Sequence, residues 1–295
     1  MKIKVLSWLI TAFFFAFSTL SAQEMSKPPS KTIVATLYPL YIALINLTKG
    51  IPNYQVLHLA DTPTGCLHDY QLTTSDLKKI MRADIVVING AGTENLEVNL
   101  KKLVSQYPQI IVINASEGLE LIKEQNEFNP HIWVSITGAM AQVKVLENKL
   151  REFDPSKADL FKKNADEYLA KLEVLKGKSA DLLKSINHRD IVTFHKAFSY
   201  FAKELNLNVA AVIELEPGKE PSAKELLNLI KAIRSKKIQS IFTEPQYSAK
   251  VAELIARETG VKIYILDPIV TGPLNENAYI EIMERNLDVL KTSLK

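Results

Sequence analysis

The chain has 295 residues, of which 47% are hydrophobic and 23% are charged, so it is long enough to form two ordinary globular domains with buried cores. Its formal net charge is only +3, with both signs mixed along the chain, which gives no support to nucleic-acid binding. Its single cysteine, Cys66, excludes an intramolecular disulfide framework.

The amino terminus has the pattern of a secretory signal peptide. Lys2 and Lys4 precede an apolar run over residues 5–17, and small or polar residues follow. A membrane anchor is the alternative, but this run is shorter than the roughly 20 residues that span a bilayer. We therefore expect a signal peptide over residues 1–22, cut near Ser21 or Ala22, a short leader over 23–30, and an exported, periplasmic protein.

From residue 31 onward, short β-branched runs alternate with longer amphipathic segments. In the first half, the predicted strands cover 33–37, 55–60, 85–89 and 110–114, and the predicted helices cover 39–48, 73–82 and 94–107. In the second half, the predicted strands cover 191–194, 209–213, 238–242 and 262–266, and the predicted helices cover 197–205, 222–236 and 248–259. This alternation predicts an α/β fold with two mainly parallel sheets flanked by helices, although no sequence repeat relates the halves.

One long helix is predicted between the two halves. Asp154 and Pro155 suit the start of a helix, and mainly apolar side chains then recur at alternating steps of four and three from Phe161 to Ile186. Gly177 costs roughly 1 kcal/mol relative to alanine, so two helices bent at this residue are the alternative. We expect a single connecting helix over 154–187, between an N-terminal lobe (31–153) and a C-terminal lobe (188–295).

Three of the five histidines lie where a predicted strand leads toward a helix. His68 stands in TPTGCLHDY, His131 in NPHIWV and His195 in VTFHKAF. Ligands of open parallel sheets bind outside the carboxyl ends of the strands, so these histidines are expected to face a cleft between the lobes. His58, inside a predicted strand, and His188, a cation just past the connecting helix, are better explained by structural roles.

Asp267 is a fourth candidate for this cleft. It ends a predicted strand in ILDPI, where it is either a turn-forming residue or a residue of the site. Three imidazoles and one carboxylate suit the tetrahedral coordination of Zn²⁺. The same residue types fit other first-row metals, although Mn²⁺ would prefer more oxygen ligands. The four candidates are far apart in sequence, so their spacing alone is a weak signal.

Five peptides resemble the metal-specific solute-binding proteins of bacterial ABC importers, the zinc- and manganese-binding family. They are GCLHDYQLTTSDLKKIMRADIVVINGAG, NPHIWVS, IVTFHKAFSYFAKELNL, EPSAKELLNLIKAIRSKKIQSIFTEPQYS and ILDPI, and the similarity extends over essentially the whole mature chain. The resemblance implies metal ligands at His68, His131, His195 and Asp267. Histidine at position 195 is typical of the zinc-binding branch, where manganese-binding members commonly have glutamate.

The resemblance further implies a receptor rather than an enzyme. Such a receptor binds Zn²⁺ in the interlobe cleft and delivers it to a membrane permease, with Mn²⁺ as the alternative metal. We expect a monomer that binds no nucleic acid. The rival hypotheses are a zinc hydrolase, which would need Glu244 or Glu216 as acid or base, and a surface adhesion protein in which the metal is structural.

The chain departs from the family pattern in two places. The segment 116–129 has no histidine, whereas many zinc-binding members carry a histidine-rich loop there. Asn129 stands where aspartate is common before the Pro-His pair. Two further residues are candidates for supporting roles. Cys66, two residues before His68, is either a soft extra donor or, more simply, a small loop residue, and Glu244 could orient a ligand or contact the other lobe.

Overall fold

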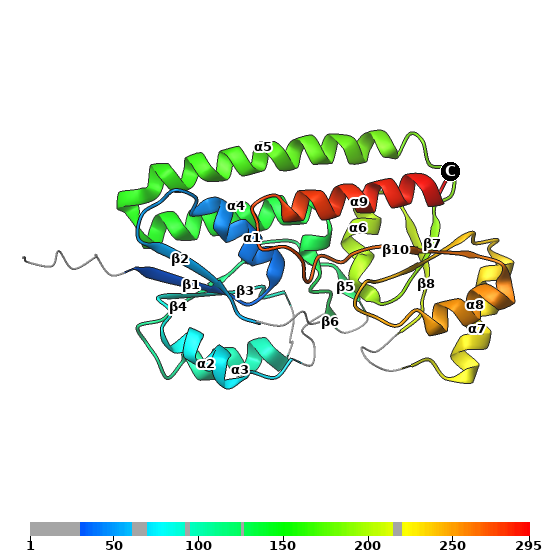
Figure 1. Cartoon of the computed structure of the whole chain (residues 1–295), viewed down its shortest axis with the longest axis horizontal. Helices are drawn as coiled ribbons and strands as arrows, with labels where there is room; N and C mark the ends of the chain where they lie inside the picture. Colours follow the sequence, from blue (N-terminus) through cyan, green and yellow to red (C-terminus); the bar gives the residue numbers. More distant parts are fainter. Residues whose placement is uncertain (1–29, 61–69, 92–94, 125–126, 215–219) are drawn as a thin grey trace, which may run out of the picture.

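The computed structural model describes residues 30–60, 70–91, 95–124, 127–214 and 220–295 (Figure 1). The expected signal peptide lies outside these ranges, as do His68, Cys66 and Glu216. No helix within the described ranges has the length and apolar character that crossing a membrane would require.

Two four-stranded parallel sheets form the framework of the molecule. The first has the order β2-β1-β3-β4, from β1 (Lys31–Ala35), β2 (Tyr54–His58), β3 (Ile85–Ile88) and β4 (Ile111–Asn114). The second has the order β10-β9-β7-β8, from β7 (Asp190–Thr193), β8 (Asn208–Val212), β9 (Ser240–Thr243) and β10 (Lys262–Ile265). All eight predicted strands are confirmed. The two halves also share one strand order, which their sequences did not reveal.

Helices cover the faces of both sheets, as expected for parallel strands. The six predicted in the two halves form, as α1 (Tyr38–Leu47), α2 (Thr74–Met81), α3 (Asn95–Val104), α6 (Ser199–Glu204), α7 (Ala223–Ser235) and α8 (Lys250–Thr259). Helices α2 and α7 begin with complete capping boxes, made by Thr73 with Asp76 and by Ser222 with Glu225. Two long helices, α4 (Ile136–Phe153) and α9 (Ala278–Ser293), and the small hairpin of β5 (Lys123–Glu124) and β6 (Glu127–Phe128) were not predicted.

The connecting helix is a single helix, but it is shorter than predicted. After one 3-10 turn over Pro155–Lys157, α5 runs through Ala158–Leu182 with Gly177 inside it. Its 25 residues span roughly 38 Å at about 1.5 Å per residue. It ends before residue 187, and residues 183–185 form a turn. Arg189 donates a hydrogen bond to the carbonyl of Leu183, just past the end of the helix, at 2.8 Å. Arg189 thus fills the role predicted for His188.

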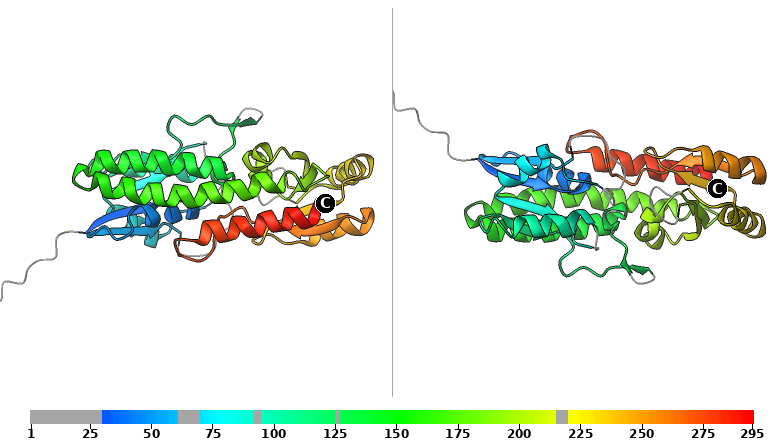
Figure 2. Two further views of the ribbon diagram at one scale, coloured as in Figure 1. Left: turned by 90° about the horizontal axis from the view of Figure 1, so that it is seen from above. Right: turned by 90° about the horizontal axis from the view of Figure 1, so that it is seen from below.

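The main hydrophobic core is continuous across the two halves. Helix α5 packs against α1, α4 and α9. Its seven buried residues are those of the predicted stripe: Phe161, Ala165, Tyr168, Leu172, Leu175, Ser179 and Leu182. Their apolar members share one cluster with residues of β1, β3 and α6. Figure 2 shows α9, the last helix of the chain, lying beside α5. The lobe limits of 31–153 and 188–295 therefore stay a prediction.

Candidate metal centre

The second sheet places two functional side chains at the point where its strand order reverses. Strands β7 and β9 are neighbours, with Thr193 opposite Phe242. When this register is continued by two residues beyond the strands, His195 lies level with Glu244. A crevice at such a reversal is the usual ligand site of an open parallel sheet.

The His195 ring is oriented by the Glu244 carboxylate. Its Nδ1 lies 2.5 Å from Glu244 Oε1, and its backbone N–H donates to the same oxygen at 3.3 Å. The second carboxylate oxygen accepts a hydrogen bond from Gln246 Nε2 at 2.9 Å. The side chains of His195 and Glu244 are only 4% and 0% exposed. Because a carboxylate can only accept, Nδ1 carries the proton, and Nε2 is the nitrogen that can bind a metal.

His131 reaches the same place from the first half of the chain. It lies between the β5–β6 hairpin and α4, where its backbone N–H and its Nδ1 both face Asn129 Oδ1, at 2.9 and 3.0 Å. The ring centroids of His131 and His195 are 5.2 Å apart, with the ring planes at 74°. The structure therefore brings together two of the predicted ligands, and asparagine serves as the acceptor behind His131.

Asp267 lies on a turn that follows β10, and this turn is fixed on both sides. Asp267 Oδ1 accepts a hydrogen bond from the backbone N–H of Ile269 at 2.8 Å, and Asn286 of α9 bonds both the N–H and the carbonyl of Asp267. Ile269 is buried with φ of 60°, an unfavourable conformation for a β-branched residue. Asp267 Oδ1 thus stabilises the turn, and the role of Asp267 as a metal ligand stays a prediction.

The Asp267 turn is connected to the His131 segment through Trp133. The indole Nε1 of Trp133 donates to the carbonyl of Pro268 at 2.8 Å, and its ring centroid is 5.3 Å from that of His131. Burial raises the pKa of Asp267; the N–H of Ile269 and nearby Arg285 act in the opposite direction, and the charge of Glu244 adds to the rise. A bound cation would offset this penalty on the charged carboxylate.

The described residues do not by themselves form a complete metal cage. Within the ranges that the structure covers, there is no group of three or more histidine, cysteine, aspartate or glutamate residues close enough to hold a metal ion. The ligand set of His68, His131, His195 and Asp267 therefore stays a prediction. The other two described histidines lie elsewhere: His58 ends β2 beside the rings of Tyr38 and Tyr41, and His188 follows α5.

One face of α6, which is separated from His195 by a 3-10 turn over Lys196–Phe198, bonds to the first half of the chain. The Tyr200 hydroxyl accepts a hydrogen bond from the N–H of Ile122 at 2.9 Å and donates to the carbonyl of Asn129 at 3.0 Å. The Glu204 carboxylate caps α4: it accepts from the N–H of Ile136 at 2.7 Å and from the Thr137 hydroxyl at 2.6 Å. These contacts hold the two halves together beside the histidine pair.

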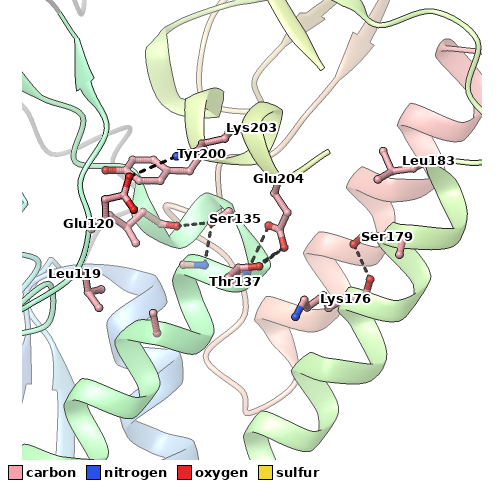
Figure 3. Close-up of a pocket in the computed structure, with 14 residues that line it drawn as sticks. Leu119, Glu120, Ser135, Thr137, Lys176, Ser179, Leu183, Tyr200, Lys203 and Glu204 are labelled. Atoms are coloured by element: carbon pink, nitrogen blue, oxygen red, sulfur yellow. Dashed lines mark hydrogen bonds and ion pairs between the residues drawn. The ribbon is translucent and has the colours of Figure 1, made fainter. Parts of the chain in front are cut away.

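A cavity of about 570 Å³ lies between α4, α5 and α6, and Tyr200, Glu204 and Thr137 are among the residues that line it. Figure 3 shows Glu204 reaching from α6 to Thr137 across its wall, with Lys176 and Ser179 of α5 opposite. Sequence reasoning missed both the cavity and the capping by Glu204. Neither has a local signal, because Glu204 is separated from Ile136 by 68 residues.

Comparison with known proteins identifies the family. Residues 33–293 match the family described as "Zinc-uptake complex component A periplasmic". The chain belongs to this family. Among curated members, the "High-affinity zinc uptake system protein ZnuA" of Bacillus subtilis is 30% identical over 91% of this chain and 89% of its own length. The "Zinc-binding protein AdcA" of Streptococcus pyogenes is 28% identical over 99% of this chain, which spans only 61% of AdcA.

The fold agrees with solved structures of metal-binding relatives. The solute-binding protein FpvC of Pseudomonas aeruginosa, in complex with Mn²⁺, matches 90% of this chain and 98% of its own chain with a TM-score of 0.79 and 31% identity. The predicted class is therefore confirmed, as are the two parallel sheets and the single helix that links them.

Proposed function

We propose that this protein is an exported receptor that binds Zn²⁺ between its lobes and delivers it to the membrane permease of an ABC importer. The observation that carries this proposal is the buried pair of His131 and His195. The two residues come from opposite halves of the chain, and each ring has Nδ1 on a side-chain oxygen. This is how metal-binding histidines are usually oriented. Two curated members of the family are named for zinc, which supports zinc as the cargo.

In this proposal His68 and His131 of the N-terminal lobe and His195 and Asp267 of the C-terminal lobe enclose the ion. Four protein ligands around Zn²⁺ leave no position for an activated water, which distinguishes a receptor from a zinc hydrolase. A hydrolase would also need Glu244 as acid or base. That carboxylate is instead engaged by His195 and by Gln246.

Manganese is the alternative cargo, since FpvC was crystallised with Mn²⁺. The proposed donor set of three nitrogens and one oxygen favours zinc, because Mn²⁺ prefers oxygen ligands. The deciding measurement is elemental analysis of protein purified without added metal, followed by competition between Zn²⁺ and Mn²⁺.

The ligand assignment is tested by metal titration of the mature protein. We expect one Zn²⁺ per chain and a large loss of affinity in His131→Ala and in His195→Ala. His188→Ala serves as the matched control, because His188 lies past the end of α5 and outside the proposed site. A stoichiometry well below one, or unchanged affinity in both site variants, would refute the proposal.

Export is tested separately from metal binding. We expect the mass of the protein recovered from the extracytoplasmic fraction to correspond to cleavage near Ser21 or Ala22. Delivery to a permease is tested by zinc-limited growth of cells that lack the gene. Growth equal to that of the parent strain would exclude this transport role.

A further inference from the structure

The Asn129 side chain touches both halves of the proposed metal site. It is buried, and its Oδ1 faces the backbone N–H and the Nδ1 of His131. Its Nδ2 donates to the carbonyl of Lys196 at 2.8 Å, and Lys196 directly follows His195. One side chain therefore fixes the ring of one histidine and the backbone beside the other.

The amide orientation follows from the partners around it. Both groups on the His131 side are donors once Nδ1 is protonated, so they require the oxygen of the amide. On the other side, Nδ2 faces three acceptors: the Lys196 carbonyl, Glu124 Oε1 at 3.0 Å and the Ser199 hydroxyl oxygen at 3.3 Å. Turning the amide over would place its NH₂ group against the two N–H donors of His131 and its oxygen against the oxygen acceptors on the other side. An aspartate would face the Lys196 carbonyl and the Glu124 carboxylate with no proton to donate.

The backbone of Asn129 is fixed as firmly as its side chain. Its N–H donates to the carbonyl of Ile122 at 2.8 Å, and its carbonyl accepts from the Tyr200 hydroxyl at 3.0 Å. Tyr200 belongs to α6, the helix that begins after the 3-10 turn following His195. The residue cannot shift toward one histidine without straining its bonds near the other.

We propose that Asn129 is a positioning residue that aligns His131 and His195 with each other across the two halves of the chain before any metal arrives. The benefit of this alignment for metal binding rests on the proposed function. The hydrogen bonds of Asn129 themselves belong to the metal-free protein and can be tested there. Preassembly of this pair removes the need to order two separate ligands when the ion binds, and it slows release because both imidazoles stay aligned.

The test uses three variants of the full mature chain. Asn129→Leu removes the acceptor and the donor while keeping the branched shape of the side chain. Asn129→Asp keeps the acceptor for His131 but removes the donor to Lys196. Ser199→Ala is the control: it removes the longest of the three contacts made by Nδ2, together with the hydrogen bond that the Ser199 hydroxyl donates to Glu124, and leaves the bonds to His131 and Lys196 in place.

The first readout is the tautomer and chemical shift of the histidine ring nitrogens by NMR in metal-free protein. In Asn129→Leu we expect the signals of both His131 and His195 to change. In Asn129→Asp we expect His131 to keep its Nδ1–H tautomer while the His195 signals still change. Ser199→Ala should leave both residues as in wild type. Unchanged His195 signals in Asn129→Leu, or full recovery of both residues in Asn129→Asp, would overturn the proposal.

The second readout is the rate of zinc release into an excess of chelator, which we expect to rise at least tenfold in Asn129→Leu. A wild-type rate in this variant would also overturn the proposal. If wild-type protein itself binds no zinc, the proposed function fails, yet the NMR comparison still decides whether Asn129 aligns the pair. If Asn129→Leu does not fold, Asn129→Asp carries the test.

Discussion

Replacement of Glu244 by glutamine should weaken zinc binding through an effect on His195. Glu244 Oε1 accepts from the backbone N–H and from Nδ1 of His195, and Oε2 accepts from Gln246 Nε2. Glutamine has one oxygen and one NH₂ group, so it can accept hydrogen bonds on only one of these two sides. If it keeps the bond to His195, the Gln246 amide has to turn over to offer its oxygen to the new NH₂, and the His195 ring is left with a neutral acceptor in place of a carboxylate. If the new side chain itself turns over, the His195 ring loses its acceptor and its fixed orientation.

The magnitude follows from the burial of this side chain, which is 0% exposed. A hydrogen bond to a buried charged group contributes about 1.5–3 kcal/mol, and loss of the partner that orients a metal-binding histidine typically costs about 10–100-fold in affinity. We expect Glu244→Gln to weaken Zn²⁺ binding within that range, measured by competition with a chelating dye. Circular dichroism of the variant verifies that it is folded.

A second substitution makes this prediction more specific. In the double variant Glu244→Gln, Gln246→Glu, the new carboxylate at 246 accepts from the amide of the glutamine at 244, so that the glutamine oxygen again faces His195. We expect the double variant to recover a large part of the lost affinity. A folded Glu244→Gln protein that binds zinc within about twofold of wild type would refute the role of Glu244, because roughly tenfold is the minimum for such a partner.

The other predictions concern pH, stability and the connecting helix. Because burial raises the pKa of Asp267, the protein loses stability as pH rises through the folded-state pKa of this residue. Asp267→Asn should therefore stabilise the metal-free protein, and increasingly so from acidic to neutral pH, as measured by chemical denaturation. The same variant should weaken zinc binding. Glu204→Gln should cost about 1–2 kcal/mol in the same assay, since a charged cap of α4 is lost, whereas Glu120→Gln, beside the same cavity, should cost almost nothing; equal losses would contradict the capping role. Gly177→Ala should stabilise the protein by about 1 kcal/mol with unchanged zinc affinity, because nothing lies within 4 Å of the added methyl; a lower melting temperature would indicate that α5 needs flexibility there. Zinc affinity measured by dye competition should fall with acidity as the imidazoles take up protons; a flat profile would argue against histidine ligands.

Most of the sheet architecture could be predicted from sequence because its signals are local. The β-branched strand runs, the capping residues of α2 and α7 and the stripe of buried residues on α5 each lie within one segment. The positions of His195 and Glu244 also follow from topology, since each ends a strand next to the reversal of strand order. Two parallel strands that end side by side bring together residues that are distant in the chain.

The rest depends on contacts between distant segments. The bonds from Asn129 to Lys196 and from Glu204 to Ile136 of α4 join residues that are 67 and 68 positions apart in the sequence, and no periodic pattern marks them. The end of α5 was overestimated because the mainly apolar stripe continues to Ile186, although the helix stops at Leu182. Ile186 is buried although it lies past the end of the helix. The spacing of apolar residues at this end of the segment therefore indicates burial and not helical structure.

Helix α9 joins the packing of the two halves of the chain. This helix is the last element of the chain, yet its Tyr279 donates a hydrogen bond to the carbonyl of Trp133, and its Glu284 pairs with Lys178 of α5. Without α9, the strip of α5 that it covers would be exposed to water. The carbonyl of Trp133 would also lose the hydrogen bond from Tyr279. The first half of the chain therefore reaches its full packing only when α9, which comes from the second half, is in place.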